Sequence, residues 1–441
     1  MFQESRKAKK SIVQCVGGVN LGVQTGPSIS LKKVQKIRLE KPKHKEVNYM
    51  NNENGKRFLK PGRHLMMGNE AMAEGAISAG LGFFGGYPIT PSTEVIEHLA
   101  KRLPQVGGVC MQMEDELASI NSVMGASLVG AKAMTATSGP GLSLMVETIS
   151  MAANLEIPFV FCDVQRCGPG TGSVTDPHHN DLGLVRFSGN GEFEVIALAP
   201  MNCQELFDLT ITAFNYAETY RCPVFILSDA YLGHLHEVVE IPPKEEILNK
   251  VIKREVPPPE EITPRVFSYL DTVKNEYVIP KPPIMGTNYV PGMFLHTPHG
   301  PEGILSPDPF RFVQTIVDKI KTNKDKICLT EKYKLDDAEI VIIAYGLPVR
   351  VSYRAIEIAR QEGIKVGAFR LITVWPFPDE QVKEVVKNAK AVIVPELNYT
   401  GIIAEQVERV TPLGTPIIKV PQVAVFHHPD DILKAIREAA R

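Results

Sequence analysis

The sequence has no paired cysteines, no long apolar segment and no strong excess of charge of either sign. Its seven cysteines are scattered, and no two stand in a C-x-x-C pair. Iron–sulfur and zinc sites need such clustered thiolates, so we expect no cluster and no other metal site in this chain. No apolar run reaches the ~18 residues of a membrane-spanning helix, and the charged N-terminus lacks the apolar core of a signal peptide. These absences predict a cytoplasmic protein.

The composition that remains is ordinary. The 441 residues include 44% apolar and 22% charged side chains, and the formal net charge is −2. Such values are typical of globular chains and exclude a wholly disordered protein, a collagen and a long coiled coil. At ~100–200 residues per domain, the length predicts two or three domains.

The first 65 residues differ from the rest because they hold 15 Lys and Arg against four Asp and Glu. A basic arm can bind nucleic acid or a membrane. This one has neither interleaved aromatic residues nor an amphipathic helix of convincing length. We therefore predict a basic N-terminal extension that lies on an acidic surface of a partner or of this chain, with nucleic-acid binding as the less favoured alternative.

From residue 66 onward, strand-like and helix-like segments alternate. Strands are predicted over residues 81–87, 108–112, 131–137 and 158–163, and helices over residues 69–80, 93–102, 114–128 and 142–153. Ser92 is predicted to cap the helix 93–102. Alternation of this kind is typical of a parallel sheet covered on both faces. Residues 66–240 are therefore predicted to form a doubly wound α/β domain.

Residues rich in Pro, Gly and charge interrupt this alternation. We interpret residues 241–335 as a linker or arm with one helix, near residues 310–323. Strands and helices alternate again over residues 336–441, which have the length of a compact domain. The predicted fold class is thus α/β, with two doubly wound parallel-sheet domains.

Three loops in the first domain carry polar residues, and each follows a predicted strand, where open parallel sheets place their ligands. Residues 85–92 offer the hydroxyls of Thr90 and Ser92, although a rigid capped turn would explain them equally well. Residues 113–120 bring Glu116 onto a face of small side chains, where a buried carboxylate needs a partner such as a protonated heteroaromatic nitrogen. Residues 165–172 combine free backbone N–H groups with the guanidinium of Arg166, which suits a carboxylate or a phosphate.

Four motifs in fixed order make the pattern specific: Gly86-Tyr-Pro-Ile-Thr-Pro-Ser92, Gln112-Met-Glu-Asp-Glu116, Thr137-Ser-Gly-Pro-Gly141 and Asp163-Val-Gln-Arg-x-Gly-Pro169. Together they resemble the alpha subunit of the 2-oxoacid:ferredoxin oxidoreductases and look closest to the 2-oxoglutarate type. The resemblance runs from about Met66 to the C-terminus and leaves out the basic extension. It implies that residues 66–240 are a pyrimidine-binding domain for thiamine diphosphate and that residues 336–441 resemble the C-terminal domain of transketolase.

The resemblance also implies roles for individual residues. Glu116 would hydrogen-bond N1′ of the aminopyrimidine and act as the catalytic glutamate, with Glu114 as the fallback. Cofactor binding would fall to Tyr87, Pro88, Ile89 and Glu116. The substrate would be bound by Thr90, Arg166 and Thr171, of which the last two would hold the 2-oxoacid carboxylate.

The same resemblance implies an enzyme that is active only as a complex. A beta subunit, with gamma- and delta-type subunits, would carry Mg²⁺ and the [4Fe–4S] clusters, and coenzyme A and ferredoxin would accept the acyl group and the electrons. Two alternatives are the beta-type subunit of a lipoate-linked 2-oxoacid dehydrogenase and a non-catalytic scaffold subunit. The stretch Gly189-Asn-Gly-Glu192 departs from the family pattern and leaves branched-chain 2-oxoacids and pyruvate open as substrates. Arg186, His178 and His179 are candidates to meet a distal carboxylate.

Overall fold

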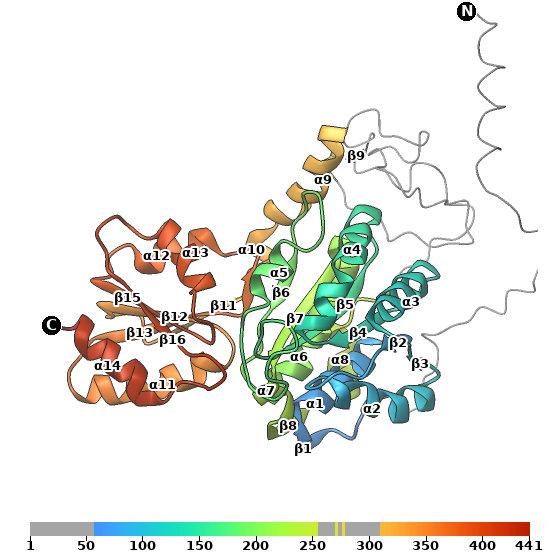
Figure 1. Ribbon diagram of the computed structural model, residues 1–441, viewed down its shortest axis with the longest axis horizontal. Helices are drawn as coiled ribbons and strands as arrows, with labels where there is room; N and C mark the ends of the chain where they lie inside the picture. Colours follow the sequence, from blue (N-terminus) through green and yellow to red (C-terminus); the bar gives the residue numbers. More distant parts are fainter. Residues whose placement is uncertain (1–56, 255–269, 272–275, 278–308) are drawn as a thin grey trace, which may run out of the picture. The chain divides into compact units, whose positions relative to one another are not determined.

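The computed structural model describes residues 57–254, 270–271, 276–277 and 309–441 (Figure 1). All of these residues fall in one unit of the chain, Tyr49–Arg441. The basic extension predicted over residues 1–65 lies outside the described residues except for its last few. Within the described ranges, no helix is both long and apolar enough to cross a bilayer.

The first sheet has the strand order β14-β6-β7-β5-β4-β2-β3 among the described residues. Its strands are β2 (Phe83–Gly86), β3 (Val109–Gln112), β4 (Ala133–Thr137), β5 (Phe159–Gln165), β6 (Ile196–Leu198), β7 (Pro223–Asp229) and β14 (Thr373–Trp375). All neighbours run parallel except β14, which pairs antiparallel with β6. The central β5 is buried along its whole length, as a parallel strand covered on both faces must be.

Helices cover both faces of this sheet. They are α1 (Gly68–Ala79), α2 (Thr93–Arg102), the 3₁₀ turn η2 (Leu103–Val106), α3 (Glu116–Leu128), α4 (Gly139–Leu155), α5 (Leu182–Arg186), α6 (Cys203–Tyr220) and α7 (Ala230–His234). Val160 and Cys162 of β5 share a core with α1 and α6, whereas Phe159 and Phe161 share one with α3 and α4. The period of two along the strand therefore distributes its side chains between two cores.

A two-stranded antiparallel ladder of β1 (Gly62–Met67) and β8 (His236–Ile241) joins the two ends of the first domain, and α8 (Lys244–Lys250) follows it. Outside the predicted domain 66–240, the described part of residues 241–335 contains α8, α9 (Pro309–Lys321) and α10 (Lys324–Ile327), so the prediction of a single helix was wrong. The two short strands β9 (Leu270–Asp271) and β10 (Glu276–Tyr277) pair with one another.

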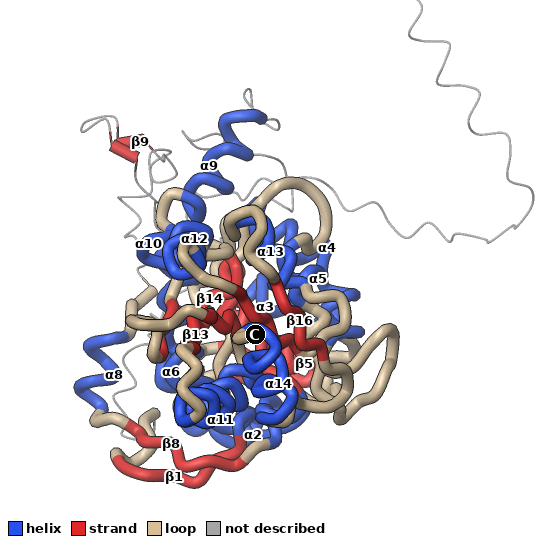
Figure 2. The backbone as a smooth tube through the Cα atoms, turned by 90° about the vertical axis from the view of Figure 1, so that its left-hand side faces the viewer, coloured by secondary structure: helices blue, strands red, loops and turns tan. Residues whose placement is uncertain are grey.

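The second sheet has the order β11-β13-β12-β15-β16. Its strands are β11 (Thr330–Tyr333), β12 (Ile340–Ala344), β13 (Val366–Leu371), β15 (Ala391–Glu396) and β16 (Ile417–Pro421). Its helices are α11 (Leu347–Gln361), α12 (Asp379–Val386), α13 (Ile402–Val410) and α14 (Pro429–Ala439). The helices α11 and α14 pack side by side on one face, as Figure 2 shows. The helices α12 and α13 share their core with α3 and α4 of the first domain.

The predicted class of two parallel α/β domains is confirmed, and each sheet also has one antiparallel strand at its edge. Because β11 pairs with β13, the second sheet begins before the boundary placed at residue 336. The edge strand β14 belongs to the C-terminal stretch but extends the first sheet. The Trp375 indole N–H donates to the Leu182 carbonyl at 3.0 Å and fixes this crossover.

Two local predictions were wrong. Ser92 does not cap α2, because its hydroxyl donates back to the Ile89 carbonyl at 2.9 Å. The helix predicted over residues 142–153 begins earlier than predicted, because α4 already starts at Gly139. Pro140 is compatible with that position, since the first N–H groups of a helix have no intrahelical partner.

Candidate active site

The three loops singled out from the sequence meet at the carboxyl edge of the first sheet. The strands β3, β2, β4 and β5 are parallel neighbours, so the segments that follow them emerge on the same side. One contact joins two of the loops directly: an N–H of Arg166 donates to the Thr90 carbonyl at 2.7 Å. Residues far apart in the sequence are thus brought to one place.

Glu116 is the first residue of α3 and is only 7% exposed. Asp115 caps this helix, since its carboxylate accepts the Ala118 N–H at 2.7 Å. The Glu116 carboxylate lies within electrostatic range of the Arg166 guanidinium. Glu114 is exposed, which favours Glu116 over Glu114 as the functional carboxylate.

Gly141, in the first turn of α4, lies directly against this carboxylate. A Cβ placed on Gly141 would lie 2.8 Å from Glu116 Oε1 and 2.0 Å from the Thr137 hydroxyl oxygen. A side chain at this position would therefore displace Glu116. The glycine in the Thr137–Gly141 motif is explained by this close approach.

Arg166 follows β5 and is 6% exposed. One of its terminal nitrogens is used by the Thr90 carbonyl, while its Nε has no partner in the described part of the chain. Burial lowers the pKa of the guanidinium, and the carboxylates of Asp181 and Glu116 oppose this. The group stays cationic and keeps donors for an anion.

Arg166 lines a cavity of about 250 Å³. The walls come from the amino end of α4 and from the loop after β5; they are Gly139, Pro140, Ser143, Arg166, Gly168, Pro169, Gly170, Asn180, Asp181 and Leu184. A cavity with one buried cation, a hydroxyl and an amide has the chemistry to hold a small carboxylic acid.

Asp163 and Asp181 were missed as site residues. Both carboxyls are buried, one at the end of β5 and the other in the cavity wall. Burial raises the pKa of Asp163 well above its usual range, and it raises the pKa of Asp181 to about 6. A signal was present, because Asp163 interrupts an otherwise apolar strand, where an acid needs a specific partner.

The remaining predicted residues lie nearer the surface. Tyr87 and Thr90 are exposed, and Pro88 and Ile89 are half-buried on the loop after β2. Thr171 is exposed, and its hydroxyl has no hydrogen-bond partner among the described residues. The structure joins Thr90 to Arg166 through the Thr90 backbone carbonyl.

Two of the candidates for a distal carboxylate are already paired. Arg186 bonds Glu194 at 2.9 Å, and the His179 ring bonds Asp229 at 3.0 Å. His178 is buried, and this burial lowers the pKa of its ring. The ring of His178 is therefore neutral at pH 7.

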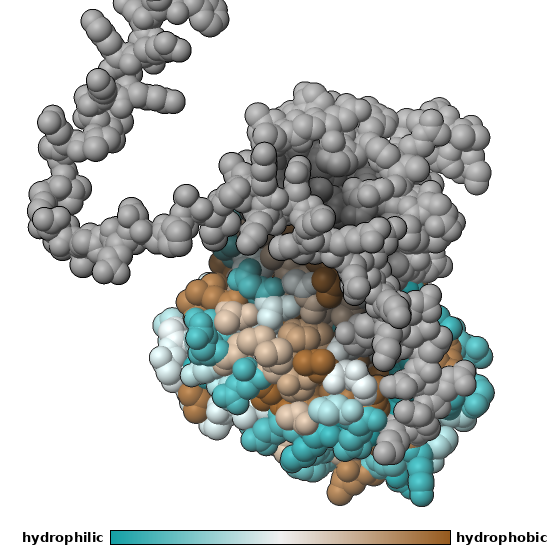
Figure 3. Space-filling model, turned by 90° about the vertical axis from the view of Figure 1, so that its right-hand side faces the viewer, coloured by the Kyte–Doolittle hydropathy of each residue, from teal (hydrophilic) through white to brown (hydrophobic). Residues whose placement is uncertain are grey.

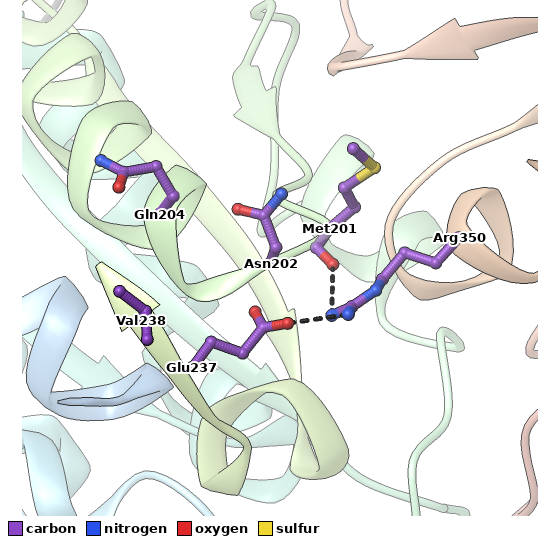
Figure 4. Close-up of a pocket in the computed structure, with 6 residues that line it drawn as sticks. All are labelled: Met201, Asn202, Gln204, Glu237, Val238 and Arg350. Carbon is purple, nitrogen blue, oxygen red and sulfur yellow. Dashed lines mark hydrogen bonds and ion pairs between the residues drawn. The ribbon is translucent and has the colours of Figure 1, made fainter. Parts of the chain in front are cut away.

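A larger cavity of about 440 Å³ lies elsewhere on the molecule and shares no lining residue with the cavity at Arg166 (Figure 4). Its charged groups satisfy one another, since Arg350 bonds Glu237 at 2.7 Å and the Met201 carbonyl at 3.5 Å. It offers no unpaired charge to a ligand, so size alone does not make it the active site.

An apolar surface flanks Glu116. Along the edge strand β3 and the small-residue face of α3, a hollow of about 480 Å³ is lined by Gly82, Phe83, Val109, Met111, Met113, Ser122, Gly125, Ala126, Val129 and Ala131. Val129 is 62% exposed and Met111 46%. Figure 3 shows apolar side chains gathered at the centre of this side of the molecule. An exposed apolar patch next to a binding site marks a protein contact.

The described residues contain no group of three or more His, Cys, Asp or Glu placed to hold a metal ion. The six cysteines in the described ranges are unpaired, and five of them are buried.

Comparison with known proteins places the chain in a family. The profile described as "Pyruvate flavodoxin/ferredoxin oxidoreductase, thiamine diP-bdg" matches residues 74–297, and "Pyruvate:ferredoxin oxidoreductase core domain II" matches residues 338–427. The chain is 44% identical to a 2-oxoglutarate synthase subunit KorA of Methanocaldococcus jannaschii, over 84% of this chain and 98% of that one. It is 35% identical to a ketoisovalerate oxidoreductase subunit VorB of Methanothermobacter marburgensis, over 85% and 97%.

A solved structure agrees. The 2-oxoglutarate:ferredoxin oxidoreductase from Magnetococcus marinus, with 2-oxoglutarate, coenzyme A and succinyl-CoA bound, is 31% identical with a TM-score of 0.77. The match covers 86% of this chain and 66% of that one. On the sequence profiles, the relatives and the fold together, the chain belongs to the thiamine diphosphate-binding pyruvate flavodoxin/ferredoxin oxidoreductase family.

Proposed function

We propose that this chain is the alpha subunit of a thiamine diphosphate-dependent 2-oxoacid:ferredoxin oxidoreductase whose substrate is 2-oxoglutarate. The complex converts a 2-oxoacid, coenzyme A and oxidised ferredoxin to acyl-CoA, CO₂ and reduced ferredoxin, reversibly and in the cytoplasm. The observation that carries the proposal is the placement of a buried acid, Glu116, within electrostatic range of a buried cation, Arg166, at one sheet edge. The 44% identity to a 2-oxoglutarate synthase subunit supports the choice of substrate.

Glu116 fits the pyrimidine half of the cofactor. Glu116 is buried, and its carboxylate is approached closely by Gly141. When bound, thiamine diphosphate supplies the nucleophilic carbon and the electron sink for decarboxylation. The part of Glu116 is to share a proton with N1′ of the ring, and burial favours this shared proton over an isolated charge. The loop with Tyr87, Pro88 and Ile89 lies beside it and forms the outer wall of the cofactor site.

Arg166 holds the C1 carboxylate of the substrate. A guanidinium fixes both the position and the plane of a carboxylate, and the Thr90 carbonyl already fixes one edge of this one. The hydroxyls of Thr90 and Thr171 each supply a further hydrogen bond to the substrate. For Thr171 this requires the loop 168–172 to fold inward from its exposed position.

The rest of the site lies on partner subunits. The apolar surface along α3 and β3 supports a beta subunit that docks there and carries the cofactor's diphosphate and Mg²⁺. The [4Fe–4S] clusters that pass electrons to ferredoxin belong to the partners, among them gamma- and delta-type subunits. The second sheet, with its helices α11 to α14, forms the C-terminal part of the alpha subunit.

The test is co-expression of this chain with its partner subunits and an assay of viologen-dye reduction. We expect reduction only when coenzyme A and a 2-oxoacid are both present, with a higher kcat/KM for 2-oxoglutarate than for 2-oxoisovalerate or pyruvate. A preference for 2-oxoisovalerate would move the chain to the branched-chain class. Dependence on a lipoyl domain and NAD would overturn the proposal.

A further inference from the structure

One carboxyl in the cavity wall, that of Asp181, belongs to a pair of buried acids that the proposed reaction does not use. Asp163 on β5 is 0% exposed, and Asp181, just before α5, is 5% exposed. The two side chains contact one another. Both oxygens of Asp163 and the Oδ2 atom of Asp181 find no donor among the described residues. Two carboxyl groups can bond to one another only through a proton, so the pair holds at least one.

The two acids differ in what faces them. Asp181 Oδ1 accepts an N–H of Asn180 at 2.9 Å, and its carboxylate feels the positive charge of Arg166. A Cβ on Gly139 would lie 3.0 and 3.1 Å from the two Asp181 oxygens, so the amino end of the helix α4 abuts this carboxylate. A helix amino end favours negative charge. Asp163 has none of these partners, so Asp163 keeps the shared proton and Asp181 carries the charge.

We infer that binding of the 2-oxoacid at Arg166 is coupled to uptake of one proton from solvent by Asp181, which makes Asp181 a positioning residue for the substrate carboxylate. The inference rests on the proposed function of Arg166. Asp181 and Arg166 line the same cavity, so an anion that enters it meets the carboxylate as well as the guanidinium. Once Asp181 is neutral, the Arg166 donors that the Thr90 carbonyl does not use face the substrate carboxylate without a competing charge, and the repulsion is gone.

The direction in which substrate affinity changes with pH follows from the pKa of Asp181 in the site without substrate. Burial raises the pKa of Asp181 to about 6, and a second anion beside it raises that pKa further. Substrate affinity is therefore highest near or below pH 6 and falls as the pH rises through the interval between the two pKa values. The limit for one linked proton is about tenfold per pH unit. The other groups facing the pair are His179, Arg166 and, across Arg166, Glu116. The substrate carboxylates ionise below about pH 4 and do not titrate in this range.

The experiment uses the complete complex between pH 6.0 and 8.5. KM for 2-oxoglutarate is measured by viologen reduction. Proton uptake on substrate binding is measured by calorimetry in two buffers of different ionisation enthalpy. For the wild type we expect KM to rise with pH by several-fold per unit, and a net uptake approaching one proton in the middle of the range.

Two isosteric variants should move in opposite directions. Asp181→Asn is neutral at every pH, so KM should stay at the low acid limit and proton uptake should vanish. Asp163→Asn donates an amide N–H to Asp181 and keeps it ionised, so KM should stay at the high alkaline limit. Asp208→Asn is the matched control, because Asp208 is a partly buried acid with a raised pKa that bonds Gln204 on α6. It should leave the wild-type profile unchanged.

Loss of folding in a variant does not remove the test, since wild-type proton uptake needs no substitution. A complex that turns over 2-oxoglutarate with a pH-independent KM and no proton uptake would overturn the coupling and leave the proposed function standing. A pH-dependent KM with proton uptake in Asp181→Asn would also overturn the coupling and leave the proposed function standing. A complex that turns over no 2-oxoacid would overturn both.

Discussion

The replacement Glu116→Gln tests the proposed catalytic role directly. The amide has almost the same volume as the carboxyl group, and the site is tight because Gly141 and Thr137 pack against it. The fold should survive. Loss of one charge at the amino end of α3 changes the free energy of unfolding by ~0.3–1 kcal/mol. The amide cannot share the proton with N1′, so we expect turnover to fall by at least ~10²-fold, the size of a positioned acid–base group.

The measurement is kcat for 2-oxoglutarate-dependent viologen reduction by the complex, at saturating thiamine diphosphate and coenzyme A. A fall of ~10²-fold corresponds to ~2.7 kcal/mol in activation free energy. Circular dichroism and urea unfolding establish that the variant is folded. Glu114→Gln is the control, since Glu114 is exposed on the same segment and should behave like the wild type. Retention of more than about a tenth of the activity in Glu116→Gln, or an inactive Glu114→Gln, would refute this assignment.

Four further outcomes are expected. The isolated chain, supplied with cofactor, Mg²⁺ and coenzyme A, should reduce no viologen dye; turnover would contradict the divided site. Arg166→Lys should lower kcat/KM for every 2-oxoacid by a factor that corresponds to ~2–3 kcal/mol of activation free energy, because a charged hydrogen bond is weakened in place. Unchanged steady-state kinetics with weaker subunit association would remove Arg166 from the site. Gly141→Ala should lower the free energy of unfolding by ~1–3 kcal/mol in urea and reduce turnover, because the new methyl would overlap the Thr137 hydroxyl. Glu218→Ala should lower the free energy of unfolding by ~3–5 kcal/mol in the same urea assay, because it leaves the buried Arg254 without the carboxylate that it bonds at 2.6 Å. A decrease below about 1 kcal/mol would show that solvent reaches Arg254.

Local patterns predicted the central elements well. Helix α2 begins and ends at the predicted residues 93 and 102, and an alternation of strands and helices was predicted for the domain that contains strand β13. Both have strong signals, an amphipathic repeat in the helix and a wholly buried strand in the sheet. The edge strands β11 and β14 were missed, because they are short and are held by partners far along the chain rather than by an apolar run.

The residues of the candidate site also differ in how clearly the local sequence pattern indicated them. Glu116 and Arg166 carry signals of their own, a carboxylate entering a face of small residues and a guanidinium in a glycine-rich loop. Thr171 had a signal only through its motif, and the structure leaves it exposed. Its role in substrate binding stays a prediction.

The sequence by itself determined the class of fold, the order of the three loops and the family resemblance, because periodicity and motif spacing are local properties of the chain. Only the tertiary structure decided which carboxylate is buried, Glu116 rather than Glu114. It alone brought Asp181 to Asp163 and to Arg166. Burial and charge pairing depend on which segments pack together. The long loop after β5 returns its end to the amino terminus of α4, and no local pattern in the sequence encodes that return.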